Sequence, residues 1–219
     1  MKVIYDAAHA FGVRDGGGSI LRYGDLSVLS FHATKVFNTF EGGCIISHDT
    51  KSKTYIDQLK NFGFVDEVTV VEAGINGKMS EFNAALGLLQ LKYIDAAVGR
   101  RKAICEIYCE KLKNVKGISV IHNSNQIKPN YSYFPILVEE NYPISRDELF
   151  QNLKKNNIYS RRYFYPLISD FPMYADFPSA DPATLQVANS IARKVICLPI
   201  YTDLIIEEQE KIICILKEA

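Results

Sequence analysis

Short apolar runs separated by polar loops most constrain what this chain can fold into. Residues 3–5, 27–31 and 42–47 each have the length and composition of a strand, and a helical pattern follows the third run. Strands that are apolar throughout are typical of sheets covered on both faces. The N-terminal part of the sequence therefore predicts an α/β layer with both sheet faces buried.

A longer helical pattern follows this layer. Ser80 is a suitable N-cap, and apolar residues then repeat at three- and four-residue steps as far as about residue 114, so we expect one long connecting helix with a kink near Gly99. Beyond it we expect strands at residues 118–121, 131–138, 158–164 and 195–198, and helices at 145–156, from Asp181–Pro182 onward, and at 207–217. This change of pattern predicts two domains, at residues 1–98 and 99–219.

Composition excludes several functional classes. The 25 basic and 25 acidic side chains balance, which leaves no basic footprint for nucleic acid. No apolar run approaches the roughly 18 residues of a membrane span, and no signal-peptide pattern is present. The five cysteines are odd in number and scattered, unlike a disulfide framework or a metal site. We expect a cytoplasmic protein without a metal and without nucleic-acid or membrane partners.

Three consecutive glycines follow Asp15. A phosphate-binding loop would need a following Gly-Lys-Ser/Thr or a second glycine at dinucleotide-motif spacing, and neither is present. Residues 15–19 are therefore predicted to form a plain turn with no ligand.

An acidic residue and a lysine stand where two predicted strands end. Asp6 follows the first run and Lys35 lies just beyond the second. Open α/β sheets bind ligands at such ends, and the pair suits pyridoxal 5'-phosphate (PLP), which needs an amine to bond it and a carboxylate to keep its ring nitrogen protonated. By spacing alone, the more common meaning of the pattern is a turn-capping Asp6 and a solvated Lys35.

Several ordered motifs add a family resemblance. Residues 3–12 (VIYDAAHAFG), 30–35 (SFHATK), 41–43 (EGG) and 74–87 (GINGKMSEFNAALG) resemble, in that order, the motifs of the DegT/DnrJ/EryC1/StrS aminotransferases. The resemblance covers nearly the whole chain. It implies an α/β fold of the aspartate aminotransferase type, made of a partial large domain and a small α+β domain, with PLP as cofactor and a homodimer as the assembly.

The resemblance assigns roles to five residues. Lys35 corresponds to the lysine that bonds the cofactor and moves the proton during transfer, and Asp6 to the carboxylate that faces the ring nitrogen. His9 stands beside the ring and Ser30 matches a hydroxyl that binds the cofactor phosphate, although a structural histidine and a buried strand serine are the alternatives. Asn76 corresponds to the residue that reaches the partner's cofactor phosphate, and a turn residue is its alternative.

Two further residues are assigned to the substrate. Tyr165 lies in an aromatic segment, residues 163–166, that resembles the substrate-side segment of the family, although an aromatic cluster is usually core. Arg162, next to Arg161, is placed to meet the diphosphate of a sugar nucleotide, and surface salt bridges explain two arginines equally well.

The chain also departs from the family pattern. Members carry a further stretch of large domain before the strand that holds the aspartate, with a phosphate-gripping turn and an aromatic residue that stacks on the ring; this sequence begins at that strand. We therefore expect a C-terminal portion of the enzyme that exposes apolar strand edges and helix faces.

The implied reaction moves an amino group from glutamate to a nucleotide-linked keto-deoxysugar, for aminosugar and polysaccharide biosynthesis. Residues 31–37 are closest to members that act on dTDP-4-keto-6-deoxyglucose. A related dehydratase would have histidine in place of the lysine, so Lys35 argues against that activity. The alternative from another class is a truncated, non-catalytic fragment or a dimerisation or regulatory module that binds no cofactor.

Overall fold

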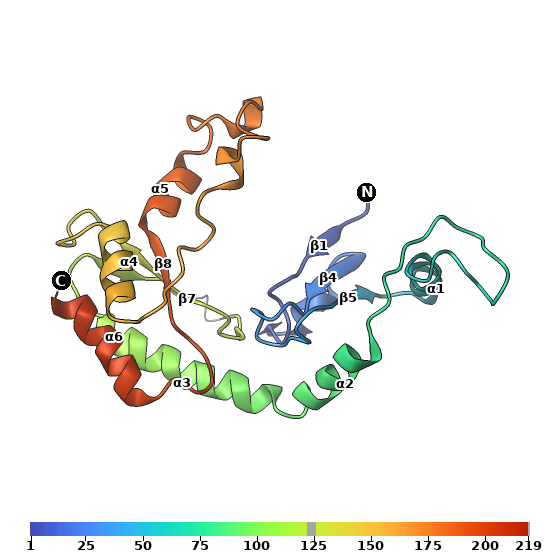
Figure 1. The fold of residues 1–219 in the computed structure, drawn as a ribbon, viewed down its shortest axis with the longest axis horizontal. Coiled ribbons are helices and arrows are strands. Elements are labelled where there is room, and N and C mark those ends of the chain that lie inside the picture. Colours follow the sequence, from blue (N-terminus) through green and yellow to red (C-terminus); the bar gives the residue numbers. More distant parts are fainter. Residues whose placement is uncertain (122–125, 219) are drawn as a thin grey trace. The chain divides into compact units, whose positions relative to one another are not determined.

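The computed structural model describes residues 1–121 and 126–218 (Figure 1). It contains two compact units: the first comprises Met1–Val98 with the described part of Ser124–Ser132, and the second the remaining described residues. Residues 126–132 thus group with the first unit, although the sequence places them in the C-terminal domain. The assignment of residues 1–98 as a partial PLP-binding domain stays a prediction.

A three-stranded sheet forms the centre of the first unit. Its order is β1 (Ile4–Asp6), β4 (Leu26–Ser30), β5 (Gly43–Ser47), close to the predicted strands. β1 runs parallel to β4, with Asp6 opposite Val28, whereas β4 and β5 are antiparallel. The glycine-rich turn joins the short hairpin of β2 (Arg14–Asp15) and β3 (Gly18–Ser19), which confirms the turn prediction.

Only one face of this sheet is covered. Residues that alternate along the strands, together with the loops, form a core: Ala7, Leu29, Phe31 and Phe37 are buried, with Phe11, Leu21 and Ile46 packed against them. On the opposite face Ile4 is 62%, Val28 42% and Ile45 45% exposed. The prediction of two buried faces is wrong for the described residues, because these apolar residues of the second face remain substantially exposed.

The segment predicted as one long connecting helix contains two helices. After β5 come α1 (Thr50–Leu59) and a long loop, and the first of the two helices is then α2 (Glu81–Gln90), which Ser80 caps as predicted. α3 (Ile94–Leu112) then begins after a three-residue turn. In that turn the amides of Lys92 and Tyr93 donate to carbonyls three residues back, which forms a tight turn between the two helices. Gly99 lies inside α3, so the break is not at the predicted kink.

The second unit packs helices against an antiparallel sheet. β7 (Phe134–Val138) lies between β6 (Ile118–Val120) and β8 (Val195–Leu198), and α4 (Arg146–Lys155), α5 (Gln186–Lys194) and α6 (Ile206–Glu218) complete it with α3 (Figure 1). The fully buried core side chains come from the helices, the strands and the loop after β8: Ile104, Tyr108, Leu112, Ile136, Leu149, Leu153, Ile196, Leu204, Ile213 and Leu216. Every residue of β8 is buried, as its apolar sequence predicts.

Two predicted elements of this unit are wrong. Residues 158–164 form no strand; Arg161 alone pairs with Cys197, and Phe164 adopts a left-handed φ of 49° that ends any extended run. Asp181–Pro182 does not open a helix. The Asp181 side chain and carbonyl bond to the amides of Ala183 and Thr184, which closes a turn, and α5 begins only at Gln186.

Among the residues that the structure describes, no helix combines the length and the apolarity needed to cross a membrane.

Candidate functional site

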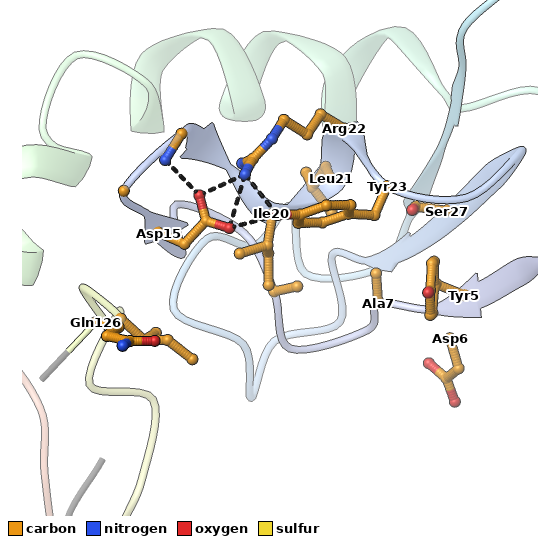
Figure 2. Close-up of a pocket in the computed structure, with 14 residues that line it drawn as sticks. Tyr5, Asp6, Ala7, Asp15, Ile20, Leu21, Arg22, Tyr23, Ser27 and Gln126 are labelled. Carbon is orange, nitrogen blue, oxygen red and sulfur yellow. Dashed lines mark hydrogen bonds and ion pairs between the residues drawn. The ribbon is translucent and has the colours of Figure 1, made fainter. Parts of the chain in front are cut away.

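Asp6 lies at the carboxyl end of β1, where the parallel strand β4 also ends. The amide of Ala7 still bonds to the carbonyl of Val28, and the chain then leaves the sheet. The Asp6 side chain is exposed and accepts one hydrogen bond, from the amide of Ala8 to Oδ1 at 3.1 Å. Figure 2 shows its carboxylate pointing away from Asp15 and Arg22. Oδ2 takes no hydrogen bond from the part of the chain that is described, so it is available to a ligand.

His9 and Lys35 meet beside this edge. The Lys35 Nζ lies 3.0 Å from His9 Nε2, in a half-buried position, although the two residues are 26 positions apart. The amine and the imidazole nitrogen are thus within hydrogen-bond distance of each other. The loops after β1 and β4 thus bring together two of the predicted site residues.

The loop that carries Lys35 is folded tightly onto the end of β4. The amide of Thr39 donates to the carbonyl of Phe31 at 2.9 Å, and the amide of Phe31 donates to the carbonyl of Gly42 at 2.8 Å. Thr39 is 1% exposed, and its hydroxyl donates to the carbonyl of Glu41 at 2.7 Å. The loop therefore returns to its starting point and fixes the base of the lysine.

Aromatic packing also supports the loop that carries Lys35. Phe11 stacks on Phe37 with ring centroids 4.2 Å apart, and Phe31 meets Phe37 edge-on at 4.8 Å. Such pairs add to the free energy of burial. The His9 loop and the Lys35 loop thus share one apolar base.

Ser30 is the last residue of β4 and is half-buried. Its hydroxyl accepts a hydrogen bond from the amide of His32 at 3.3 Å, and its backbone pairs with Gly43 of β5. The hydroxyl proton remains available as a donor at the same sheet edge as Asp6.

Asn76 is not brought to this edge by the contacts of the described residues. It is exposed in the loop between α1 and α2, where its backbone pairs with Asn61. The neighbouring amide of Ile75 bonds to the carbonyl of Leu59 at 2.7 Å. A side chain at Gly74 would lie 2.5 Å from that same carbonyl, so this position requires glycine. The motif thus holds Asn76 outward from the unit.

Arg162 and Tyr165 belong to the second unit. The Arg162 guanidinium lies over the rings of Phe150 and Tyr165, at 4.8 and 4.9 Å, and its Nη1 is 3.3 Å from an Asp147 oxygen. Tyr165 also covers the guanidinium of Arg146 at 4.8 Å. The two predicted substrate residues therefore touch each other and form one cationic and aromatic group.

A cavity of about 890 Å³ adjoins Asp6 on the inner side of the sheet. Its far wall is a polar cluster in which Arg22 and Tyr23 both donate to Asp15 Oδ2, at 2.8 and 2.9 Å (Figure 2). The amide of Gly17, Arg22 and Tyr23 hold the pKa of Asp15 below its usual value. These residues satisfy one another and so shape the wall of the cavity.

Two asparagines support the site and were missed by the sequence reasoning. Asn83 of α2 donates to the carbonyls of Thr39 and Glu41, the latter at 3.0 Å, and so clamps the Lys35 loop. Asn130 donates to the carbonyls of His9 and Phe11. Asn83 lies three residues after the Ser80 cap, so its place in the first turn of α2 could have been predicted from the sequence. No motif near Asn130 predicts its contacts.

The chain is similar to known proteins over nearly its whole length. The model of the DegT/DnrJ/EryC1/StrS aminotransferase family matches residues 1–217. A curated relative, the dTDP-4-amino-4,6-dideoxy-D-glucose transaminase of Shigella dysenteriae, is 53% identical over 218 residues, which cover 100% of this chain and 59% of the relative. The chain thus spans little more than half the length of that protein.

Solved structures have the same fold. The structure of DesI in the presence of its TDP-sugar product superposes with a TM-score of 0.89 at 31% identity and covers 100% of this chain and 55% of DesI. The PLP-form of Spr1654 from Streptococcus pneumoniae, assigned as a sugar aminotransferase, gives 0.88 at 26% identity and covers 99% of this chain and 56% of Spr1654. The predicted fold class is therefore confirmed.

Proposed function

The chain belongs to the DegT/DnrJ/EryC1/StrS aminotransferase family, and from that premise we propose that it is the C-terminal portion of a PLP-dependent sugar-nucleotide transaminase. The observation that carries the proposal is the contact between Lys35 and His9, which joins the loops that follow the parallel strands β1 and β4, with Asp6 at the end of β1. The Shigella relative, 53% identical, favours a dTDP-linked 4-keto-6-deoxyglucose as the acceptor. Glutamate is the proposed amino donor.

The residues at the sheet edge fit the cofactor. When bound, PLP supplies an electron-poor ring that withdraws electrons from the substrate carbon. Asp6 is exposed with Oδ2 open to a ring N–H, and a carboxylate there keeps that nitrogen charged. The Lys35 amine is the nucleophile that bonds the cofactor and the group that carries the proton.

His9 and Ser30 have supporting roles in this proposal. The His9 imidazole contacts the Lys35 amine at hydrogen-bond distance and thereby holds it in place before the cofactor arrives. The Ser30 hydroxyl, at the end of β4, donates to the cofactor phosphate. Ser30 ends β4 and His9 lies in the loop after the parallel strand β1, an arrangement that supports binding of one ligand by both.

Asn76, Arg162 and Tyr165 complete the proposal. Asn76 is exposed, and we propose that it binds the cofactor phosphate of a second copy in a homodimer. The guanidinium of Arg162 suits a nucleotide diphosphate, with Tyr165 beneath it. We place the reaction in the cytoplasm.

The test is covalent capture of the cofactor by this chain. Purified protein is mixed with PLP, its visible absorption is recorded, and the adduct is fixed with borohydride and mapped by peptide mass spectrometry. We expect one modified residue, Lys35, and no specific label in Lys35→Ala. Lys154→Ala, which removes a lysine at the end of α4, is the matched control and should label normally.

Each result bears on the proposal. Labelling at Lys35 that is lost when glutamate is added before the borohydride supports a transaminase, and sugar-nucleotide assays then identify the acceptor. Labelling spread over many lysines, with no loss in Lys35→Ala, would contradict cofactor binding by this chain and favour the non-catalytic module instead.

A further inference from the structure

Asn130 is a buried polar residue far along the chain from the site that it touches. Its side chain is 5% exposed, and it lies 121 positions after His9. Buried amides that remain in folded proteins have their hydrogen-bonding groups satisfied. Asn130 follows this rule, because its amide nitrogen and its oxygen both have hydrogen-bond partners.

Both donors of Asn130 serve the loop after β1. Nδ2 lies 2.8 Å from the carbonyl of His9 and 2.8 Å from that of Phe11, so one amide group spans the two sides of Ala10. Oδ1 accepts from the amide of Ser132 at 3.2 Å and from its hydroxyl. The orientation of the amide is therefore fixed from both ends.

The backbone beside Asn130 is anchored as well. Lys128 and Arg14 exchange two hydrogen bonds, at 2.8 and 3.0 Å, in an isolated bridge. Residues 128–130 thus lie along the far end of the His9 loop as a short strap. The strap is bonded to the loop region at Arg14 and at the carbonyls of His9 and Phe11, so Asn130 restrains the loop.

The loop needs such support. The segment from Ala7 to Val13 is a series of turns in which Ala10 bonds back to Ala7 and Val13 to Ala10, and Gly12 has a φ of 75°. None of these bonds involves the carbonyls of His9 or Phe11. The Asn130 amide supplies donors for both, and it thereby sets the direction in which the His9 ring leaves the backbone.

We propose that Asn130 is a positioning residue for the cofactor lysine, acting through His9: it fixes the loop so that the imidazole Nε2 stays within hydrogen-bond distance of Lys35 Nζ. The proposal deepens the proposed function and rests on it. Asn130 acts at the backbone carbonyls of His9 and Phe11, so its effect on Lys35 passes through the His9 loop.

The test compares two substitutions with a matched control in the 219-residue chain without cofactor. Asn130→Asp keeps the shape but replaces two donors by acceptors that repel the carbonyls, and Asn130→Ala removes the group. Asn189→Ala is the control, because its amide donates to a single local carbonyl, that of Leu185, at 3.0 Å in the second unit. NMR then measures the His9–Lys35 side-chain NOE and the exchange protection of the amides at residues 10 and 13.

We expect both Asn130 variants to lose the NOE and at least about tenfold of the amide protection, with Asn130→Asp the more severe. The control should keep both signals. A lowered melting temperature with the NOE and the protection intact would mean a purely structural role and would overturn the proposal.

The unsubstituted protein provides a second test that needs no variant to fold. The Asn130 side-chain amide protons should exchange slowly, and their shifts should move with those of His9 when PLP bonds Lys35. Fast exchange of these protons in the folded chain would also overturn the proposal. If the NOE is present but PLP forms no adduct, the strap stands and the proposed function fails, so the two failures are distinguishable.

Discussion

Arg146 is a buried cation, and its surroundings explain how a charge is tolerated there. The residue is 3% exposed, and Nη1 donates to the carbonyls of Ala192 and Val195 at 2.8 and 2.9 Å, where α5 passes into β8. Nε contacts Asp147, which is more than half exposed. The guanidinium therefore supplies donors to two carbonyls at the junction of α5 and β8.

Removing this group has a predictable cost. We expect Arg146→Met to lower the free energy of unfolding by about 3 kcal/mol, because two buried carbonyls lose their donors. Asp147→Asn, the matched control, should change it by less than about 1 kcal/mol, since that ion pair is largely solvated. Urea denaturation followed by circular dichroism measures both. Equal losses would show that the ion pair, and not the carbonyl contacts, carries the stabilisation.

Helix α4 shows how a local signal defines an element. Ser145 Oγ accepts from the amide of Glu148, and the Glu148 carboxylate accepts from the amide of Ser145 at 2.8 Å, which is the predicted capping box. The Ser145 hydroxyl and amide hold the pKa of Glu148 below its usual value near 4.5. All the groups lie within four residues, so the sequence alone was sufficient.

The cap makes a testable contribution to pH dependence. Because the pKa of Glu148 is lower in the folded state, its stabilisation is complete above the unfolded-state pKa and is lost as the pH falls through the folded value. The stability difference between the unchanged chain and Glu148→Gln should therefore be present at pH 7 and shrink in acid. Glu140→Gln, an exposed residue outside the cap, is the control. A difference that stays constant with pH would contradict this reading.

Other elements could not be predicted from local pattern. Helical periodicity continues through Leu91–Tyr93 with no glycine or proline, yet the chain turns there, because backbone bonds and packing decide the break. At the site, the rule for parallel strand ends led us to expect Asp6 and Lys35 at one end of the sheet, and the contact of Lys35 with His9 joins the two loops concerned. The role of Asn130 escaped prediction, since its partners lie more than a hundred positions away.

At the scale of the whole molecule, the uncovered sheet face of the first unit dominates. Val28 and Ile45 are paired neighbours on β4 and β5, and both are more than 40% exposed. Leu29, which follows Val28 and points to the other face of the sheet, is 4% exposed. Apolar strands that face water favour association with other apolar surfaces.

We expect the double variant Val28→Thr, Ile45→Thr to bind less of the dye ANS and to sediment with less dependence on concentration. Its free energy of unfolding should stay within about 0.5 kcal/mol of the original for each exposed site. Leu29→Ala, on the buried face, should instead cost about 2 to 5 kcal/mol. Unchanged dye binding in the double variant would place the exposed apolar surface elsewhere.

The strap at residues 128–130 has a consequence for how such a protein can change over time. The chain contributes to the second unit, returns to the first to hold the His9 loop, and then enters the second again at Tyr133. A recombination event with one crossover at residue 98 would exchange Asn130 along with the second unit and leave the loop with a foreign strap. Inheritance of the second unit as an independent module thus requires three crossovers, one at each point where the chain passes between the units, or a donor in which the same amide is already in place.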